Sequence, residues 1–182
     1  MNGPRVLIAG VGNIFLGDDA FGVEVVRRME HRAVPPEVRV IDFGIRGIDL
    51  AYALLEDYDG AILVDAVPRG GQPGTLYVLE PDLDNLGEPG AGPPAVEAHR
   101  LDPVNVLRLA QALGGPPPAL RIIGCEPGTL APAEDGQPVL SGPVGAAVEG
   151  AITLIEAVVQ EWLGREAASC TNSASSRRSS TS

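Results

Sequence analysis

Short apolar runs alternate with amphipathic segments along most of this chain. Residues 6–9 form an apolar run that enters a glycine-rich turn at residues 10–13, which is typical of a buried parallel strand followed by a tight loop. Similar runs predict further strands at residues 38–41, 61–64 and 120–123, and an edge strand at 75–79. Apolar positions at helical spacing predict helices at residues 20–29, 49–55 and 103–113, and a last helix from Pro143. Because strands and helices alternate, we predict an α/β fold with a mostly parallel central sheet covered on both faces.

The composition changes near Gly164. Residues 1–164 contain all the predicted elements, and a chain of 182 residues is long enough for one domain with a sizeable core. Residues 165–182 are rich in Ser, Thr and Ala and offer few apolar side chains for packing. We therefore expect one α/β domain over residues 1–164 and a disordered, serine-rich tail over residues 165–182.

The charge of the chain limits its partners. It has 24 acidic residues against 13 Lys and Arg residues, a formal net charge of −11, which repels nucleic acids and anionic membrane surfaces. No apolar run approaches the roughly 20 residues that span a bilayer, and residues 1–5 lead into a strand rather than a signal peptide. We expect a cytoplasmic monomer that binds a protein or a cation, without nucleic-acid or membrane partners.

Two features of the sequence, a glycine-rich loop and a cysteine, each have a chemical and a structural interpretation. Gly10 and Gly12 follow a strand as in a dinucleotide-binding loop, but Phe15 stands where that motif has its third glycine. A nucleotide-binding domain is therefore an alternative, and we expect no organic cofactor. Cys125 paired with His99 would make a cysteine peptidase, whereas a Cys at the end of a buried strand is more often inert.

Acidic residues stand where the predicted buried strands end. Asp19, Asp65 and Glu126 each follow such a strand, so we expect them along one edge of the sheet. The loop that carries His99 can reach the same edge, and two carboxylates with one imidazole suit a divalent transition metal such as nickel, zinc or iron. Simpler interpretations also exist. Asp18 or Asp19 can cap the next helix, Asp65 can be a turn residue, and His99 can lie in solvent.

Several motifs in collinear order resemble one known family. The longest is Gly10 to Gly22, which reads GVGNIFLGDDAFG, and shorter ones are Asp42-Phe43-Gly44, residues 62–66, His99 with residues 102–107, and residues 124–128. Together these motifs resemble the nickel-iron hydrogenase maturation proteases over roughly residues 5–163, far more than one short motif would cover.

The resemblance implies a three-layer α/β/α sandwich that acts as an endopeptidase. Its implied function is to remove the C-terminal extension of a nickel-iron hydrogenase large-subunit precursor after nickel insertion. The matched positions imply that Asp19, Asp65 and His99 contact the nickel carried by the substrate, with Asp19 and Asp65 as catalytic residues. Many members of the family have Glu where this chain has Asp19, so the carboxylate here reaches one methylene less far.

The resemblance leaves the mechanism open. The nickel could polarise the scissile carbonyl or activate water, or it could be a docking point while Asp19 or Asp65 acts as general base. A chaperone that recognises the metallated precursor without cleaving it is the alternative from a different functional class.

Overall fold

In the computed structural model, which describes residues 5–86, 103–115, 119–132 and 139–176, five strands form one sheet in the order β2-β1-β3-β5-β4. The strands are β1 (Val6–Val11), β2 (Val38–Gly44), β3 (Gly60–Ala66), β4 (Leu76–Leu79) and β5 (Ala119–Cys125). The helices are α1 (Phe21–Glu30), α2 (Gly47–Ala53), α3 (Pro103–Leu113) and α4 (Gly142–Ser176), with short 3-10 turns η1 (Gly17–Ala20) and η2 (Leu83–Asn85).

Strand pairing makes the sheet mostly parallel, as the sequence predicts. β1 lies between β2 and β3, and β3 pairs with β5, all in parallel register. β4 pairs antiparallel with β5 at the edge of the sheet, so the predicted edge strand is confirmed. The carboxyl ends of the four parallel strands therefore point to one edge of the sheet.

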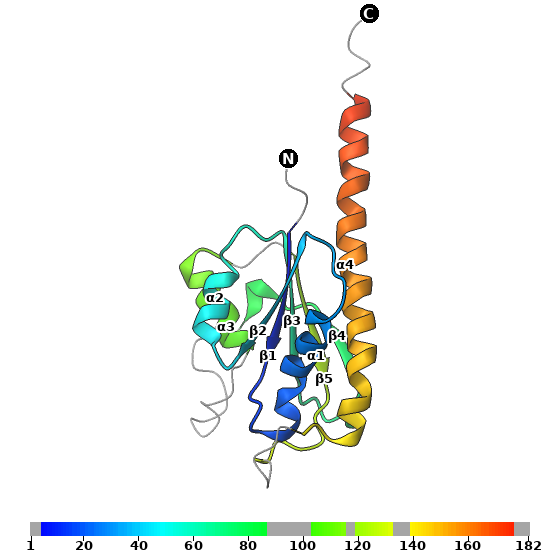
Figure 1. Cartoon of the computed structure of the whole chain (residues 1–182). Coiled ribbons are helices and arrows are strands. Elements are labelled where there is room, and N and C mark those ends of the chain that lie inside the picture. The colour runs from blue at the N-terminus through cyan, green and yellow to red at the C-terminus, as the bar shows by residue number, and fades with distance from the viewer. Residues whose placement is uncertain (1–4, 87–102, 116–118, 133–138, 177–182) are drawn as a thin grey trace, which may run out of the picture.

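Alternating side chains of each central strand divide the core into two halves. Val6 and Ile8 of β1 pack with α1 and α4, whereas Leu7, Ala9 and Val11 pack on the opposite face with α2 and α3. Figure 1 shows the resulting layers, with α1 and α4 on one side of the sheet and α2 and α3 on the other. The predicted three-layer α/β/α sandwich is confirmed.

Helix α4 differs from two of the sequence-based expectations. It continues to Ser176, so residues 165–176 are helical where a disordered tail is expected, while residues 177–182 lie outside the described part. No proline follows Gly164, and Glu166, Ala167 and Ala168 are strong helix formers, which explains the continuation. The second difference concerns Gly142–Gly164. This segment has 23 residues and contains an 18-residue window with a mean hydropathy of 1.5, so it is long and apolar enough to cross a membrane.

The apolar character of α4 is explained by its place in the core. One stripe of the helix is buried against α1 and the sheet: Val144, Val148, Ala151, Ile152, Ile155 and Val159. Beside this stripe lie exposed acids such as Glu149 and Glu156, which pair with Arg32 of the loop after α1. This amphipathic pattern is that of a helix that covers one face of a sheet.

Candidate active site

Asp19 and Asp65 lie at the edge where the central parallel strands end. Asp19 belongs to η1, which connects β1 to α1, and Asp65 is the penultimate residue of β3. β1 and β3 are neighbours whose register pairs Gly10 with Val64. Both carboxylates are buried, with 6% of each residue exposed.

Two glycines bring Asp19 and β3 together. Gly12 has a φ of 138°, and a Cβ placed on it would lie 1.7 Å from the carbonyl oxygen of Asp19. A Cβ on Gly22 would lie 2.0 Å from the carbonyl oxygen of Val64, the residue before Asp65. Only glycine permits such contacts. The glycines therefore serve a turn and the close packing of α1 on the sheet, and not the binding of a dinucleotide.

Asp18, the neighbour of Asp19, is fully buried and holds distant loops together. Its Oδ2 accepts hydrogen bonds from the amides of Gly128 at 2.7 Å and Thr129 at 2.8 Å. The amide of Ser141 donates to Oδ1 at 2.6 Å, and the Ser141 hydroxyl donates to Oδ2 at 2.9 Å. Asp18 thus fastens both described ends of the β5–α4 connection to η1. The sequence did not reveal this role, because all three partners are more than 100 residues away.

Glu126 has a similar structural role at the end of β5. Its Oε2 accepts hydrogen bonds from the Arg69 amide and the Tyr77 hydroxyl, both at 2.8 Å, and its Oε1 accepts one from the Gly70 amide at 3.1 Å. Burial acts to raise the pKa of Glu126, but these hydrogen bonds outweigh it and lower the pKa below its ordinary value. Glu126 therefore fixes the loop that leaves β3 just after Asp65.

The hydrogen bonds of Asp19 and Asp65 are of a different kind. The Asn13 amide donates to Oδ2 of Asp19, and the Ala66 amide donates to Oδ1 of Asp65, each at 2.8 Å. Neither η1 nor α1 has a side-chain cap, so the expectation that Asp18 or Asp19 caps the helix is wrong. The local amides orient both carboxylates at the sheet edge.

The third predicted metal contact, His99, lies outside the described residues. Within the described part of the chain, no group of three or more His, Cys, Asp or Glu side chains could hold a metal ion by itself. The structure therefore places two of the three predicted contacts, Asp19 and Asp65, at the expected edge.

Cys125 does not have the properties of a catalytic thiol. Its side chain is fully buried at the end of β5. Burial raises the pKa of the Cys125 thiol to about 11, and the negative charge of Asp18 adds to the increase. At neutral pH the group is a protonated thiol, which is a poor nucleophile. The geometry favours the inert interpretation over a cysteine peptidase.

Comparison with known proteins decides the family. A family model described as hydrogenase maturation protease (HycI) matches residues 23–158. The chain belongs to this family. The hydrogenase expression/formation protein HupD of Rhodobacter capsulatus is 38% identical over 141 residues, which are 73% of this chain and 65% of that protein. The hydrogenase 2 maturation protease of Escherichia coli is 30% identical over 165 residues, which are 90% of this chain and 98% of that protein.

The fold is shared with solved members of the hydrogenase maturation protease family. The hydrogenase maturating endopeptidase HybD of Escherichia coli is 29% identical and superposes with a TM-score of 0.71, covering 86% of this chain and 93% of that one. A hydrogenase 2 maturation peptidase from a Thaumarchaeota archaeon is 35% identical, with a TM-score of 0.60 over 88% of this chain and 98% of that one. These likenesses favour a peptide hydrolase over a nucleotide-binding domain or a chaperone.

Proposed function

We propose that this chain is the endopeptidase that removes the C-terminal extension of a nickel-iron hydrogenase large-subunit precursor after nickel insertion. Its membership of the hydrogenase maturation protease family supports this proposal. The structural observation that carries it is the pair of buried carboxylates, Asp19 and Asp65, at the end of neighbouring strands. Asp18 and Glu126, which are also buried in the described part of the chain, hold loops together.

The proposed role of the site is to recognise nickel that is already bound to the precursor. Asp19 and Asp65 supply carboxylate oxygens and His99 supplies an imidazole, while thiolates of the precursor complete the coordination. Full coordination then requires the protease, the precursor and the metal together. A precursor without nickel is left uncut, so cleavage reports successful metal insertion.

The chemistry expected of the chain is general-base catalysis by a carboxylate. Asp19 or Asp65 accepts a proton from water, the water oxygen adds to the scissile carbonyl, and the amide nitrogen leaves as an amine after protonation. The Asn13 and Ala66 amides, which donate to these carboxylates, would hold them in place during the proton transfer. Cys125 has no part in this mechanism.

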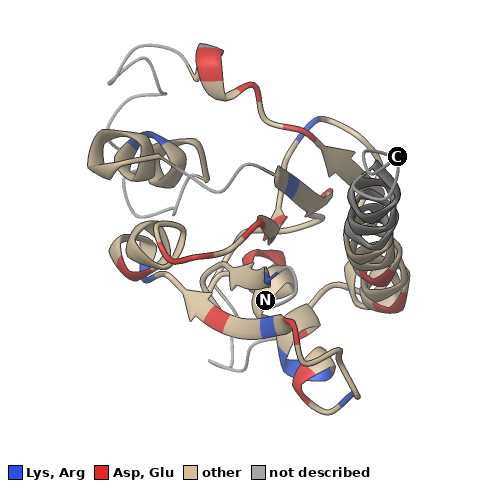
Figure 2. Cartoon of the chain, turned by 90° about the horizontal axis from the view of Figure 1, so that it is seen from above, with Lys and Arg blue, Asp and Glu red and all other residues tan. Residues whose placement is uncertain are grey.

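Surface charge supports a protein substrate in solution. The chain carries a net charge of −11, and Figure 2 shows acidic residues on many elements of the described chain. We propose a cytoplasmic monomer with neither nucleic-acid nor membrane partners. The apolar segment of α4 fits this proposal because its apolar stripe is buried in the core.

The decisive experiment measures the mass of the precursor before and after incubation with the protease. We expect the nickel-loaded precursor to lose a C-terminal fragment and the metal-free precursor to keep its mass. His99→Ala should abolish the cleavage without unfolding the protein, while His31→Ala, which changes the other histidine of the chain at an exposed position, should leave it unchanged. Binding of the loaded precursor without any loss of mass would favour a chaperone instead.

A further inference from the structure

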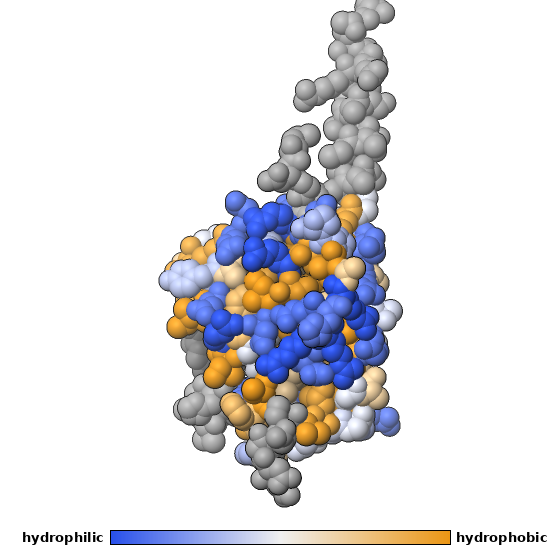
Figure 3. Space-filling view, in the orientation of Figure 1, coloured by the Kyte–Doolittle hydropathy of each residue, from blue (hydrophilic) through white to orange (hydrophobic). Residues whose placement is uncertain are grey.

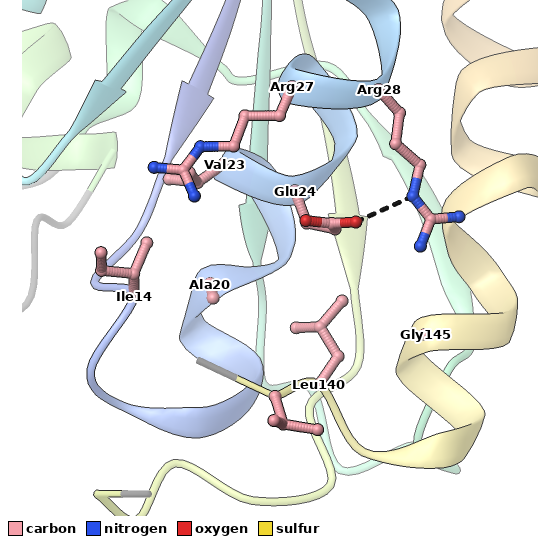
Figure 4. A pocket seen from close by; sticks show the side chains of 9 residues that line it. Ile14, Ala20, Val23, Glu24, Arg27, Arg28, Leu140 and Gly145 are labelled. Carbon is pink, nitrogen blue, oxygen red and sulfur yellow. Dashed lines mark hydrogen bonds and ion pairs between the residues drawn. The ribbon is translucent and has the colours of Figure 1, made fainter. Parts of the chain in front are cut away.

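A pocket of about 270 Å³ lies beside the candidate active site, between α1 and the start of α4. Figure 4 shows that its walls come from the loop after β1, one side of α1, and the residues that lead into α4. Ile14, Val23 and Leu140 give it an apolar lining, and Arg27 and Arg28 stand at its side.

Two residues that line the pocket are close to Asp19 along the chain or through a hydrogen bond. Ala20, which lines the pocket, is the next residue in the chain after Asp19. Ile14, another lining residue, follows Asn13, whose amide donates to the Asp19 carboxylate at 2.8 Å. Because Ile14 follows Asn13 directly, the wall of the pocket lies within the length of about two residues of extended chain, each about 3.3–3.6 Å, from the Asp19 carboxylate.

The charged groups of the pocket are already paired. Arg28 donates to Glu24 at 2.8 Å, and Arg27 forms an ion pair with Asp42 at 3.4 Å. An anion entering the pocket would have to compete with these carboxylates. An apolar group, in contrast, gains from leaving water without breaking either pair.

The size and surroundings of the pocket favour a peptide side chain as the occupant. Its volume of about 270 Å³ lies below the range of roughly 300–1,000 Å³ typical of small-molecule sites. Val139, which also lines the pocket, is 67% exposed, so part of the apolar lining is in contact with solvent. Figure 3 shows hydrophilic side chains in a band across this face, with hydrophobic ones below it towards the edge where the strands end.

We propose that this pocket receives one apolar side chain of the hydrogenase precursor next to the peptide bond that is cut. The inference rests on the proposed function, because it assigns the precursor as the occupant. It adds a second element of recognition, since nickel reports that the metal is present and the pocket fixes which peptide bond lies beside the carboxylates. The same apolar contact also contributes to the affinity for the precursor.

Gly145 offers a way to fill the pocket without disturbing the core. It lies in the first turn of α4, and a Cβ placed on it would meet only Leu140, at an ordinary contact distance of 3.9 Å. Gly145→Leu should therefore fold, because leucine favours a helix more than glycine does. Gly164→Leu is the matched control, since the same change falls on the same helix, at an exposed glycine with open space around it.

The test measures cleavage of the nickel-loaded precursor, with the folding of each variant verified by thermal unfolding. We expect Gly145→Leu to lower kcat/KM roughly 10- to 100-fold, the value of one buried apolar side chain. Gly164→Leu should stay within about twofold of the unmodified protease. After the cut is located by mass, apolar residues within about four positions of it are changed to Ala one at a time. One of these changes should slow the unmodified protease and have no further effect on Gly145→Leu.

Each result has a defined meaning. If Gly145→Leu cleaves as fast as Gly164→Leu, or if no change in the precursor is coupled to Gly145, the pocket is not a subsite. If Gly145→Leu does not fold, Val139→Ser provides the same test, because the exposed Val139 contributes little to the core. Val139→Ser should then weaken cleavage, and an unchanged rate would refute the inference. Failure of the unmodified protease to cut any loaded precursor would instead refute the proposed function itself.

Discussion

The clearest prediction concerns two adjacent aspartates, Asp18 and Asp19, for which the structure assigns opposite roles. Asp18 is fully buried and accepts four hydrogen bonds from Gly128, Thr129 and Ser141. Asp18→Ala removes the acceptor and leaves three amides and one hydroxyl without it. We expect this variant to lose stability, whereas Asp19→Ala loses cleavage.

The size of the effect follows from the number of donors. A buried amide that loses its acceptor costs about 1–3 kcal/mol, and water entering the cavity restores part of this. For three amides we expect a loss of about 3–5 kcal/mol, a large fraction of the roughly 5–15 kcal/mol that stabilises a typical domain. For a chain of this length, such a loss lowers the melting temperature by roughly 6–20 °C.

Urea denaturation of both variants provides the measurement. Asp18→Ala should unfold at a lower urea concentration with an unchanged dependence on urea, because the same surface is exposed on unfolding. Asp19→Ala should unfold closer to the unmodified protein while its cleavage of the loaded precursor is abolished. The reasoning is refuted if Asp18→Ala is as stable as the unmodified protein, or if Asp19→Ala is the less stable of the two.

Two further predictions concern Cys125 and Glu126. The chain has one other cysteine, Cys170, which is replaced by Ser so that only one thiol remains. In this Cys170→Ser background, Cys125→Ala should cleave the nickel-loaded precursor normally; loss of cleavage by the folded variant would identify Cys125 as the nucleophile. Because burial raises the pKa of the Cys125 thiol to about 11 from an unfolded value of 9.0, the native state keeps its proton longer, so stability falls between these pH values. This fall should be absent in Cys125→Ala, as alkaline denaturation would show. The pKa of Glu126 is lowered in the native state, so its contribution to stability is present at neutral pH and lost in acid. Tyr77→Phe, which removes one hydrogen bond to Glu126, should therefore lower the stability near pH 7 and lower it much less near pH 3. Denaturation curves of the variant and the unmodified protein that differ equally at both pH values would contradict the assignment.

The sequence predicted the elements of the fold because each one is encoded locally. The residues predicted for α3 are those observed, because Pro103 is favoured in the first turn of a helix and the apolar spacing is regular. β1, β2, β3 and β5 extend beyond the predicted runs by two or three residues in total. Glycine or aspartate interrupts the apolar signal after each run, but these residues still pair in the sheet, as Gly10 does with Asp42 and Asp65 with Gly124. The helical residues 165–176 have little apolar periodicity, so the pattern gave no sign of their helix.

The site was predictable only as far as the strand ends reveal it. The positions of Asp19 and Asp65 at one edge follow from parallel strands that are neighbours in the sheet. The roles of Asp18 and Glu126 do not, because a buried acid that holds a loop has the same local sequence as one that faces a substrate. The distinction depends on partners far along the chain, such as Ser141 for Asp18, and these are visible only in the folded structure.

The contacts of Asp18 also set an order of events during synthesis of the protein. Its partners follow it by 110 to 123 residues, so a growing chain contains η1 long before the groups that fasten it. At about 5–20 residues per second, the ribosome needs roughly 6–25 s to add the residues between Asp18 and Ser141. During this interval the edge that carries Asp19 lacks its support, and we expect the nascent chain to be inactive. The protease thus acquires its activity only after Ser141 has been added to the chain.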